Sequence, residues 1–155
     1  MANPVENNVD EHSELIAFKI ADQDFCFNIM SVREIRGWTP ATVIPHSPDY
    51  VRGVINLRGA VVPIIDLAAR LSLPVPEPTS RNVIIITQID GPTVGLLVDA
   101  VSDILSVGLD DVQPTPEVAS DESNCFVTGI ITHDDRMIRM IDIAGILPEV
   151  PGVTG

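Results

Sequence analysis

The chain repeats its own pattern, and this internal repeat limits the available folds more than any other feature. With a shift of 69 residues, segment 15–45 aligns with 84–114 and gives the pairs Ile16/Ile85, Ile20/Ile89, Val32/Val101, Ile35/Ile104, Val43/Val112 and Pro45/Pro114. With a shift of 76, segment 53–71 aligns with 129–147 and gives the pairs Gly53/Gly129, Ile55/Ile131, Ile65/Ile141, Asp66/Asp142, Ala68/Ala144 and Leu71/Leu147. The step from glycine to aspartate is 13 residues in both halves (66 − 53 and 142 − 129), which indicates a duplicated architecture.

The boundaries of the two repeats follow from the composition between them. The shift changes where "HSPDYVR" is replaced by the longer, polar "TPEVASDESNCFVT", as expected of an insertion in a surface loop. Three prolines in "SLPVPEPTS" indicate an extended connector. We therefore expect one domain over 13–148, built from repeats 13–71 and 82–147 joined by connector 72–81, with flexible tails at 1–12 and 149–155. Exchange of strands between the repeats is compatible with this pattern.

Hairpin signals and residue usage favour an all-β fold. Apolar runs flank Asp22-Gln23-Asp24 in one repeat and Asp90-Gly91-Pro92 in the other, which predicts a hairpin at each place. Aromatic residues make up only 4%, so valine, isoleucine and leucine must fill the core, and β-branched residues favour strands. About five short strands per repeat predict two pseudo-symmetric five-stranded small barrels.

Short helical turns are expected between the strands. Val32 and Ile35 in "IMSVREIRGW" are three residues apart, which would place them on one face of a helical turn. In "DLAARL" and "DIAGIL" the aspartates Asp66 and Asp142 occupy the position of an N-cap.

The charge balance argues against nucleic acids and anionic membranes as partners. The chain has 22 acidic and 9 basic residues, a net charge of −13, and no cluster of lysines and arginines. The polar, acidic start lacks the features of a signal peptide, and runs such as "VIII" at 83–86 are too short to span a bilayer, so we expect a cytoplasmic protein.

No pattern in the chain predicts catalysis, a metal or a cofactor. Cys26 and Cys125 lie in apolar contexts and are expected to be buried, reduced thiols, and three scattered histidines form no metal motif. A carboxylate dyad of Asp66 and Asp142 lacks the small flanking residues that such a pair needs, so helix caps are the better interpretation. His46 in "IPHSPDY" could pair with a serine, but no nucleophile motif accompanies it.

The bend in "GVINLRGAVVPIIDL", residues 53–67, contains the residue that is hardest to explain by folding alone. Gly59 suits a tight two-residue turn that needs positive φ, whereas the turn makes no demand for Arg58. The corresponding bend of the second repeat carries Asp134 and Asp135, so the geometry is repeated and the charge is reversed. Arg58 therefore either makes a directional contact or serves only as a solubilising charge on a turn.

Four segments together resemble the CheW family of chemotaxis coupling proteins: "SVREIRGW", "GVINLRGAVVPIIDL", "VGLLVDAVSDIL" and "GIITHDDRMIRMIDIAGIL". They occur in order between about residues 13 and 148. The resemblance implies two barrels of the Src-homology-3-like kind and a non-catalytic adaptor without cofactors. It also implies two partners, the cytoplasmic tip of chemoreceptors and the regulatory domain of the histidine kinase CheA.

The resemblance also assigns contact residues by position. The receptor contact would comprise Val32, Glu34, Ile35, Asn56, Leu57, Arg58, Gly59, Val98 and Val101. The kinase contact would comprise Val43, Ile44, Pro45, Asp111, Gln113 and Val118. Gln113 and Val118 stand where relatives often carry a basic and an aromatic residue, which departs from the family pattern.

The resemblance further implies an adaptor that is a monomer when isolated and is recruited from the cytoplasm to receptor clusters without entering the membrane. Two alternatives stay open at this point. One is a CheW-type adaptor of a different pathway that controls surface motility or development. The other is a small barrel that binds a small ligand.

Overall fold

The computed structural model describes residues 13–74, 77–88, 91–108, 111–113, 126–133 and 135–146. Its elements, in chain order, are β1 (Ser13–Ile20), β2 (Gln23–Asn28), the 3-10 turn η2 (Ile29–Ser31), β3 (Val32–Gly37), β4 (Val51–Leu57), β5 (Ala60–Asp66), α1 (Leu67–Arg70), β6 (Val83–Gln88), β7 (Thr93–Val98), β8 (Ala100–Val107), β9 (Val112–Gln113), β10 (Val127–His133), β11 (Arg136–Ile141) and α2 (Ile143–Ile146). The prediction of an all-β chain with short helical turns is confirmed.

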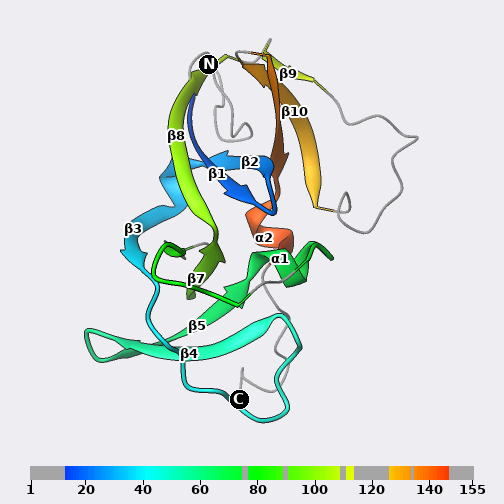
Figure 1. Cartoon of the computed structure of the whole chain (residues 1–155). Coiled ribbons are helices and arrows are strands. Elements are labelled where there is room, and N and C mark those ends of the chain that lie inside the picture. Colours follow the sequence, from blue (N-terminus) through cyan, green and yellow to red (C-terminus); the bar gives the residue numbers. More distant parts are fainter. Residues whose placement is uncertain are drawn as a thin grey trace.

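The strands form two sheets, and each sheet draws on both sequence repeats. The six-stranded sheet has the order β8-β1-β2-β11-β10-β9, and the five-stranded sheet has the order β3-β6-β7-β5-β4. Figure 1 shows the two sheets one above the other, with α1 and α2 at the level where they meet. The first hairpin of each repeat is thus inserted between strands of the other repeat, and neither repeat forms a sheet by itself.

A parallel strand pair joins the repeats within each sheet. β2 pairs with β11 in the six-stranded sheet, where Cys26 faces Met140. β7 pairs with β5 in the five-stranded sheet, where Leu96 faces Ile65. All other strand pairs are antiparallel, and two of them, β1–β8 and β3–β6, also join the repeats, so each exchanged hairpin is held on both sides by backbone hydrogen bonds.

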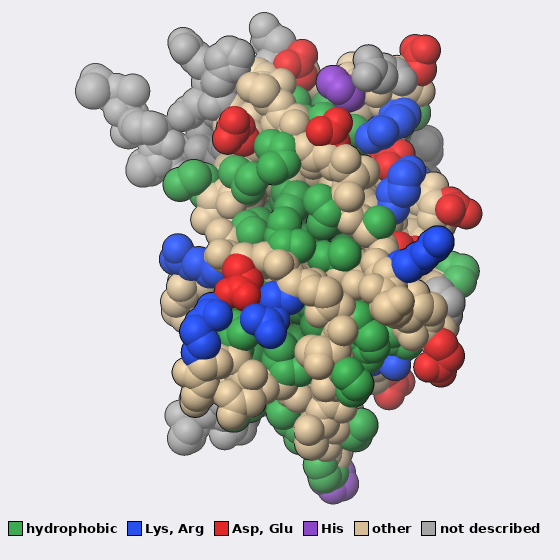
Figure 2. Space-filling model, turned by 60° about the vertical axis from the view of Figure 1, so that its left-hand side comes forward, with side chains coloured by type: hydrophobic (Ala, Val, Ile, Leu, Met, Phe, Trp, Pro, Cys, Tyr) green, Lys and Arg blue, Asp and Glu red, His purple; other side chains and the backbone are tan. Residues whose placement is uncertain are grey.

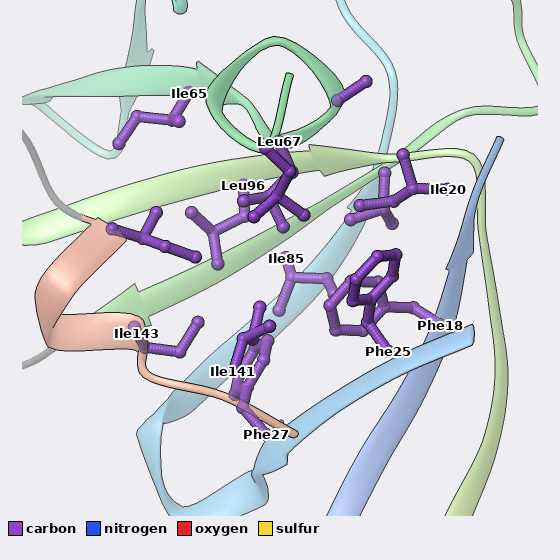
Figure 3. Close-up of a cluster of buried hydrophobic side chains, with 14 of the residues drawn as sticks. Phe18, Ile20, Phe25, Phe27, Ile65, Leu67, Ile85, Leu96, Ile141 and Ile143 are labelled. Atoms are coloured by element: carbon purple, nitrogen blue, oxygen red, sulfur yellow. The ribbon is translucent and has the colours of Figure 1, made fainter. Parts of the chain in front are cut away.

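The largest apolar cluster lies between the two sheets and belongs to both. Its fully buried members come from both repeats, and Figure 3 labels ten of them: Phe18, Ile20, Phe25, Phe27, Ile65, Leu67, Ile85, Leu96, Ile141 and Ile143. A second, smaller cluster fills the interior of the six-stranded sheet, and a third fills the interior of the five-stranded sheet. Each large side chain contributes about 1.5–3 kcal/mol on burial, so the shared cluster binds the two sheets into one folding unit.

Among the predicted turns that lie wholly within the described residues, one hairpin turn agrees with the sequence, whereas one hairpin turn and one helical turn differ from it. Arg58 and Gly59 form the predicted two-residue turn, with φ of 52° and 88°. In the first hairpin the turn is Ala21-Asp22 rather than 22–24, because Gln23 already pairs with Ile20. The predicted helical turn containing Val32 and Ile35 is wrong. The helical turn ends at Ser31, and both residues lie in β3, where their backbone pairs with β6.

The aspartate before each final helical turn closes that turn. The side chain of Asp66 accepts hydrogen bonds from the backbone N–H of Ala68 (3.1 Å) and Ala69 (3.3 Å), as predicted for an N-cap. Asp142 accepts through its backbone carbonyl from Gly145 and Ile146 (3.1 and 3.2 Å). The side-chain cap accounts for the aspartate at position 66, whereas the backbone contacts at position 142 make no demand on the side chain.

The structural reason for glycine differs between the two repeated positions, Gly53 and Gly129. Gly53 has a φ of 144°, and a Cβ there would lie 2.3 Å from the carbonyl oxygen of Thr42. A Cβ at Gly129 would lie 2.8 Å from the Val112 side chain and 3.1 Å from the carbonyl oxygen of Gln113. In both repeats an incoming segment crosses the strand at the glycine, and the crossing is tighter at Gly53.

We predict that Gly53→Ala destabilises the fold more than Gly129→Ala. The first change forces a side chain into positive φ and against a backbone carbonyl, which costs about 2 kcal/mol or more. The second requires no positive φ, and its nearest contact is the Val112 side chain, which can move, with the Gln113 carbonyl oxygen farther away at 3.1 Å. The free energy of unfolding from urea titrations of the two variants measures the difference, and equal losses would contradict this account of the crossing.

Candidate partner-binding site

Two terminal strands, β3 and β8, bring related apolar residues to one face. Val32 on β3 and Val101 on β8 are half-buried and pack against the shared core. Ile35 and Ile104 are 47% and 49% exposed. Figure 2 shows a hydrophobic surface on the side of the molecule that carries these strands. Because each pair is related by the repeat, the face is built from the same position of both halves.

An ionic cluster made of Glu34, Arg36 and Arg58 spans β3 and the β4–β5 turn. Arg58 Nη2 donates to Glu34 Oε1, and Arg36 Nη1 donates to Glu34 Oε2 at 3.0 Å. The hydrogen bonds from Arg58 and then from Arg36 hold the pKa of Glu34 below its ordinary value. One carboxylate thus serves two guanidinium groups, and the cluster keeps one positive charge in excess.

The backbone of the turn that carries Arg58 is held by the side chains of its neighbours, whereas the Arg58 side chain is open to solvent. The side chain of Asn56 accepts from the backbone N–H of Gly59 at 3.0 Å, which closes the turn. Leu57 is 8% exposed and belongs to the interior of the five-stranded sheet. The Arg58 side chain remains 70% exposed. The directional contact suggested by the sequence therefore exists within the chain, to Glu34, while most of the arginine stays accessible.

Two residues of the predicted receptor contact lie in the core. Val98 is 1% exposed and belongs to the shared cluster, and Leu57 packs inside its own sheet. Both therefore act by packing, and a direct contact with a partner needs a residue at the surface. The other predicted members, Val32, Glu34, Ile35, Asn56, Arg58, Gly59 and Val101, lie on β3, β8 or the β4–β5 turn.

The residues of the predicted kinase contact fall on two separate parts of the molecule. Val43 is 75% exposed and Ile44 38% exposed, and Pro45 is exposed beside them in the segment that follows β3. Asp111 and Gln113 are exposed at β9, at the end of the six-stranded sheet. Val118 lies outside the described residues.

The sequence does not single out three further residues on β3, on β8 and in the turn before β3: the half-buried Arg36 and the exposed Ile104 and Met30. Arg36 shares Glu34 with Arg58. Residues two apart in a strand point to the same face, so the spacing of Glu34 and Arg36 in the sequence could have indicated this ion pair. Ile104 could have been found by the 69-residue shift from Ile35. Met30 is 81% exposed in the turn before β3, and no sequence signal separates it from a core methionine.

The polar groups weighed as catalytic candidates have structural partners. Asp66 caps α1 and accepts from Arg52 at 3.1 Å, and the Ser47 hydroxyl donates to the Ile44 carbonyl at 2.8 Å. Burial raises the pKa of the Cys26 thiol to about 12, which makes it a poor nucleophile. Cys125 lies outside the described residues.

Neither a metal site nor a membrane helix occurs in the part of the chain that the structure describes. Within it, no three histidine, cysteine, aspartate or glutamate side chains gather closely enough to hold a metal ion. Its helices are too short to cross a bilayer.

Comparison with known proteins gives one family over nearly the whole chain. The family model described as CheW-like domain matches residues 14–150. The chain is 54% identical over 149 residues to the chemotaxis protein CheW of Rhizobium meliloti, covering 96% of both. It is 62% identical over 136 residues to a probable chemotaxis protein CheW of Rhizobium etli, covering 88% of both.

A solved structure gives the same result for the fold. The scaffolding protein TtCheW of Thermoanaerobacter tengcongensis matches with a TM-score of 0.81 and 33% identity, covering 90% of this chain and 94% of that one. The chain belongs to the CheW family of non-catalytic chemotaxis scaffolding proteins.

Proposed function

We propose that this chain is the adaptor that couples the cytoplasmic tips of chemoreceptors to the histidine kinase CheA. The observation that carries the proposal is an exposed ionic turn beside an apolar face, on a domain that matches CheW proteins over almost its full length. High identity to proteins named for chemotaxis favours this pathway over surface motility or development.

The receptor contact is assigned to the face of β3, β8 and the β4–β5 turn. Ile35 and Ile104 offer apolar surface, as a groove that receives the apolar side of a helix would. Arg58 stands at the edge of that surface with most of its guanidinium accessible. A carboxylate on the receptor would therefore find a charge-assisted partner that fixes the orientation of the helix.

The kinase contact is assigned to two ends of the molecule. Val43, Ile44 and Pro45 supply an exposed apolar segment, and Asp111 and Gln113 belong to the other end. Val118, which is assigned to the same contact, lies outside the described residues. Two distinct contacts on one body allow alternation with a partner that also has two, which closes a ring or extends a layer. Linked contacts of this kind gain strength together, so none has to be strong alone.

Regulation then requires no chemistry in the adaptor. A receptor that moves relative to a bound kinase changes the relative energies of the kinase states. The adaptor would act in the cytoplasm at membrane-associated receptor clusters, without contact with nucleic acid or insertion into the membrane, and would be a monomer when isolated.

We predict that Arg58→Glu weakens receptor binding at least about tenfold, roughly 1.4 kcal/mol, because it removes a charge-assisted contact and adds repulsion. Binding to the CheA regulatory domain should remain. Titration calorimetry with a purified receptor cytoplasmic fragment measures the change. Arg81→Glu, the same charge change at an exposed residue that belongs to none of β3, β8 and the β4–β5 turn, is the control. Receptor binding at the wild-type level in Arg58→Glu would reject the assignment.

We predict a similar loss of receptor binding for Val32→Asp, because the change places a charge on the apolar face. Val32 is half-buried, so the circular dichroism spectrum must show that the variant is folded. Ile35→Asp makes the same test at a more exposed position. Met137→Asp, an exposed residue of the β11 strand, is the control. If Ile35→Asp folds and binds receptor like the wild type, the apolar face has another role.

A further inference from the structure

A surface pocket of about 370 Å³ opens between β3 and β4, the two terminal strands of the five-stranded sheet. We call it the seam pocket. Arg36 and Thr39 line it from the β3 side, and Val54, Asn56 and Val61 line it from the β4–β5 hairpin. Its volume is at the lower end of the range for ligand sites and suits one long side chain. Arg36 belongs to the ionic cluster as well, so the pocket adjoins that cluster.

The pocket exists because the outer edge of β4 is covered less completely than the outer edge of β10, the corresponding strand of the other repeat. In the six-stranded sheet, Val112 and Gln113 of β9 pair with Ile131 and Ile130 of β10. In the five-stranded sheet, the corresponding contact is reduced to one isolated bridge between Thr42 and Val54.

The side chain at the seam differs as well. The position of Arg36 corresponds, by the 69-residue shift, to Leu105, which is 3% exposed and fills the other interior. The fold therefore does not require an arginine or an open seam at this position.

Groups around the pocket lack partners. Arg36 donates from Nη1 to Glu34, whereas its Nε is buried without a hydrogen bond. Leaving a buried donor unpaired is costly, and an incoming acceptor would relieve that cost when the side chain turns toward the pocket.

The edge of β4 supplies a second set of polar groups. The backbone N–H and C=O of Val54 both bond to Thr42. Because alternate residues of an antiparallel strand point to the same edge, those of Asn56 face the same side. Beyond the Thr42 bridge, no strand in the described part of the chain pairs with this edge.

We propose that the seam pocket binds a glutamate side chain of the chemoreceptor tip, an inference that rests on the proposed function. The excess positive charge of the ionic cluster selects a carboxylate over a neutral group. The methylene groups of a glutamate would pack on Val61, which is 68% exposed, while its carboxylate reaches Arg36. Continuity with Arg58 places this contact on the partner that binds the β4–β5 turn.

Two variants test the pocket by different means. Arg36→Leu installs the residue of the other repeat and removes the guanidinium, and Val61→Trp fills the pocket from an exposed position. We expect each to weaken binding of a purified receptor cytoplasmic fragment about five- to tenfold in titration calorimetry. Arg81→Leu and Met137→Trp are the matched controls, the latter at the position related to Val61 by the 76-residue shift. Binding of the CheA regulatory domain should be unchanged.

Double-mutant cycles identify the bound group. Each glutamate of the receptor tip is changed to glutamine and titrated against the wild type and against Arg36→Leu. One glutamate should lose affinity with the wild type and show no further loss with Arg36→Leu. Absence of any coupled glutamate would overturn the proposal, because the pocket would then bind no receptor carboxylate.

The outcomes separate this inference from the proposed function. If Arg58→Glu loses receptor binding while Arg36→Leu and Val61→Trp bind like the wild type, the seam pocket is not a receptor site and the proposed function stands. If the pocket variants lose kinase binding instead, the assignment to the receptor is wrong. If the wild type does not bind the receptor fragment at all, both fail.

Discussion

The apolar cluster between the two sheets is the constraint on which the rest of the structure depends. Phe18 and Phe27 reach it from the first hairpin of one repeat, and Ile85 and Leu96 reach it from the first hairpin of the other. Because these hairpins are exchanged, neither sheet can form without strands of both repeats. Losing this cluster would therefore separate the sheets and expose the inner faces of both at once, so the domain should unfold as one unit.

The exchange also decides where the binding face lies. It leaves β3 and β8, strands at the same position of the two repeats, as terminal strands of different sheets. Val32 and Val101 anchor them on the shared core, so Ile35 and Ile104 are held at the surface by packing rather than by a loop. A face supported in this way is preorganised, and a partner that binds it orders few new groups.

Much of this arrangement can be predicted from the sequence. The parts that cannot be predicted depend on contacts between distant segments. The alternation and turn residues around Arg58-Gly59 predict the hairpin, and the step from Gly53 to Asp66 predicts the repeat. Strand exchange cannot be predicted, because the same strands satisfy the same pattern whichever copy they pair with. The three-residue spacing of Val32 and Ile35 predicts a helical turn, but the same spacing places two residues on one face of a strand that contains a bulge, as β3 does. Arg36 was missed because its role depends on a partner, Glu34, that is itself shared with a distant turn.

A duplicated fold separates what folding requires from what recognition requires. Several positions that agree between the repeats, such as Ile65 with Ile141 and Ile16 with Ile85, are buried, whereas Ile35 and Ile104 agree and lie at the surface. Positions that differ carry charge at the surface: Arg58 corresponds to Asp134, and Arg36 corresponds to a buried leucine. Because leucine fills the position of Arg36 in the other repeat, the fold does not call for an arginine there, and the unpaired buried Nε of Arg36 is a cost that must be offset elsewhere. Arg36 and Arg58 both belong to the five-stranded sheet, on β3 and at the β4–β5 turn, which favours this side of the molecule for contacts with a charged partner.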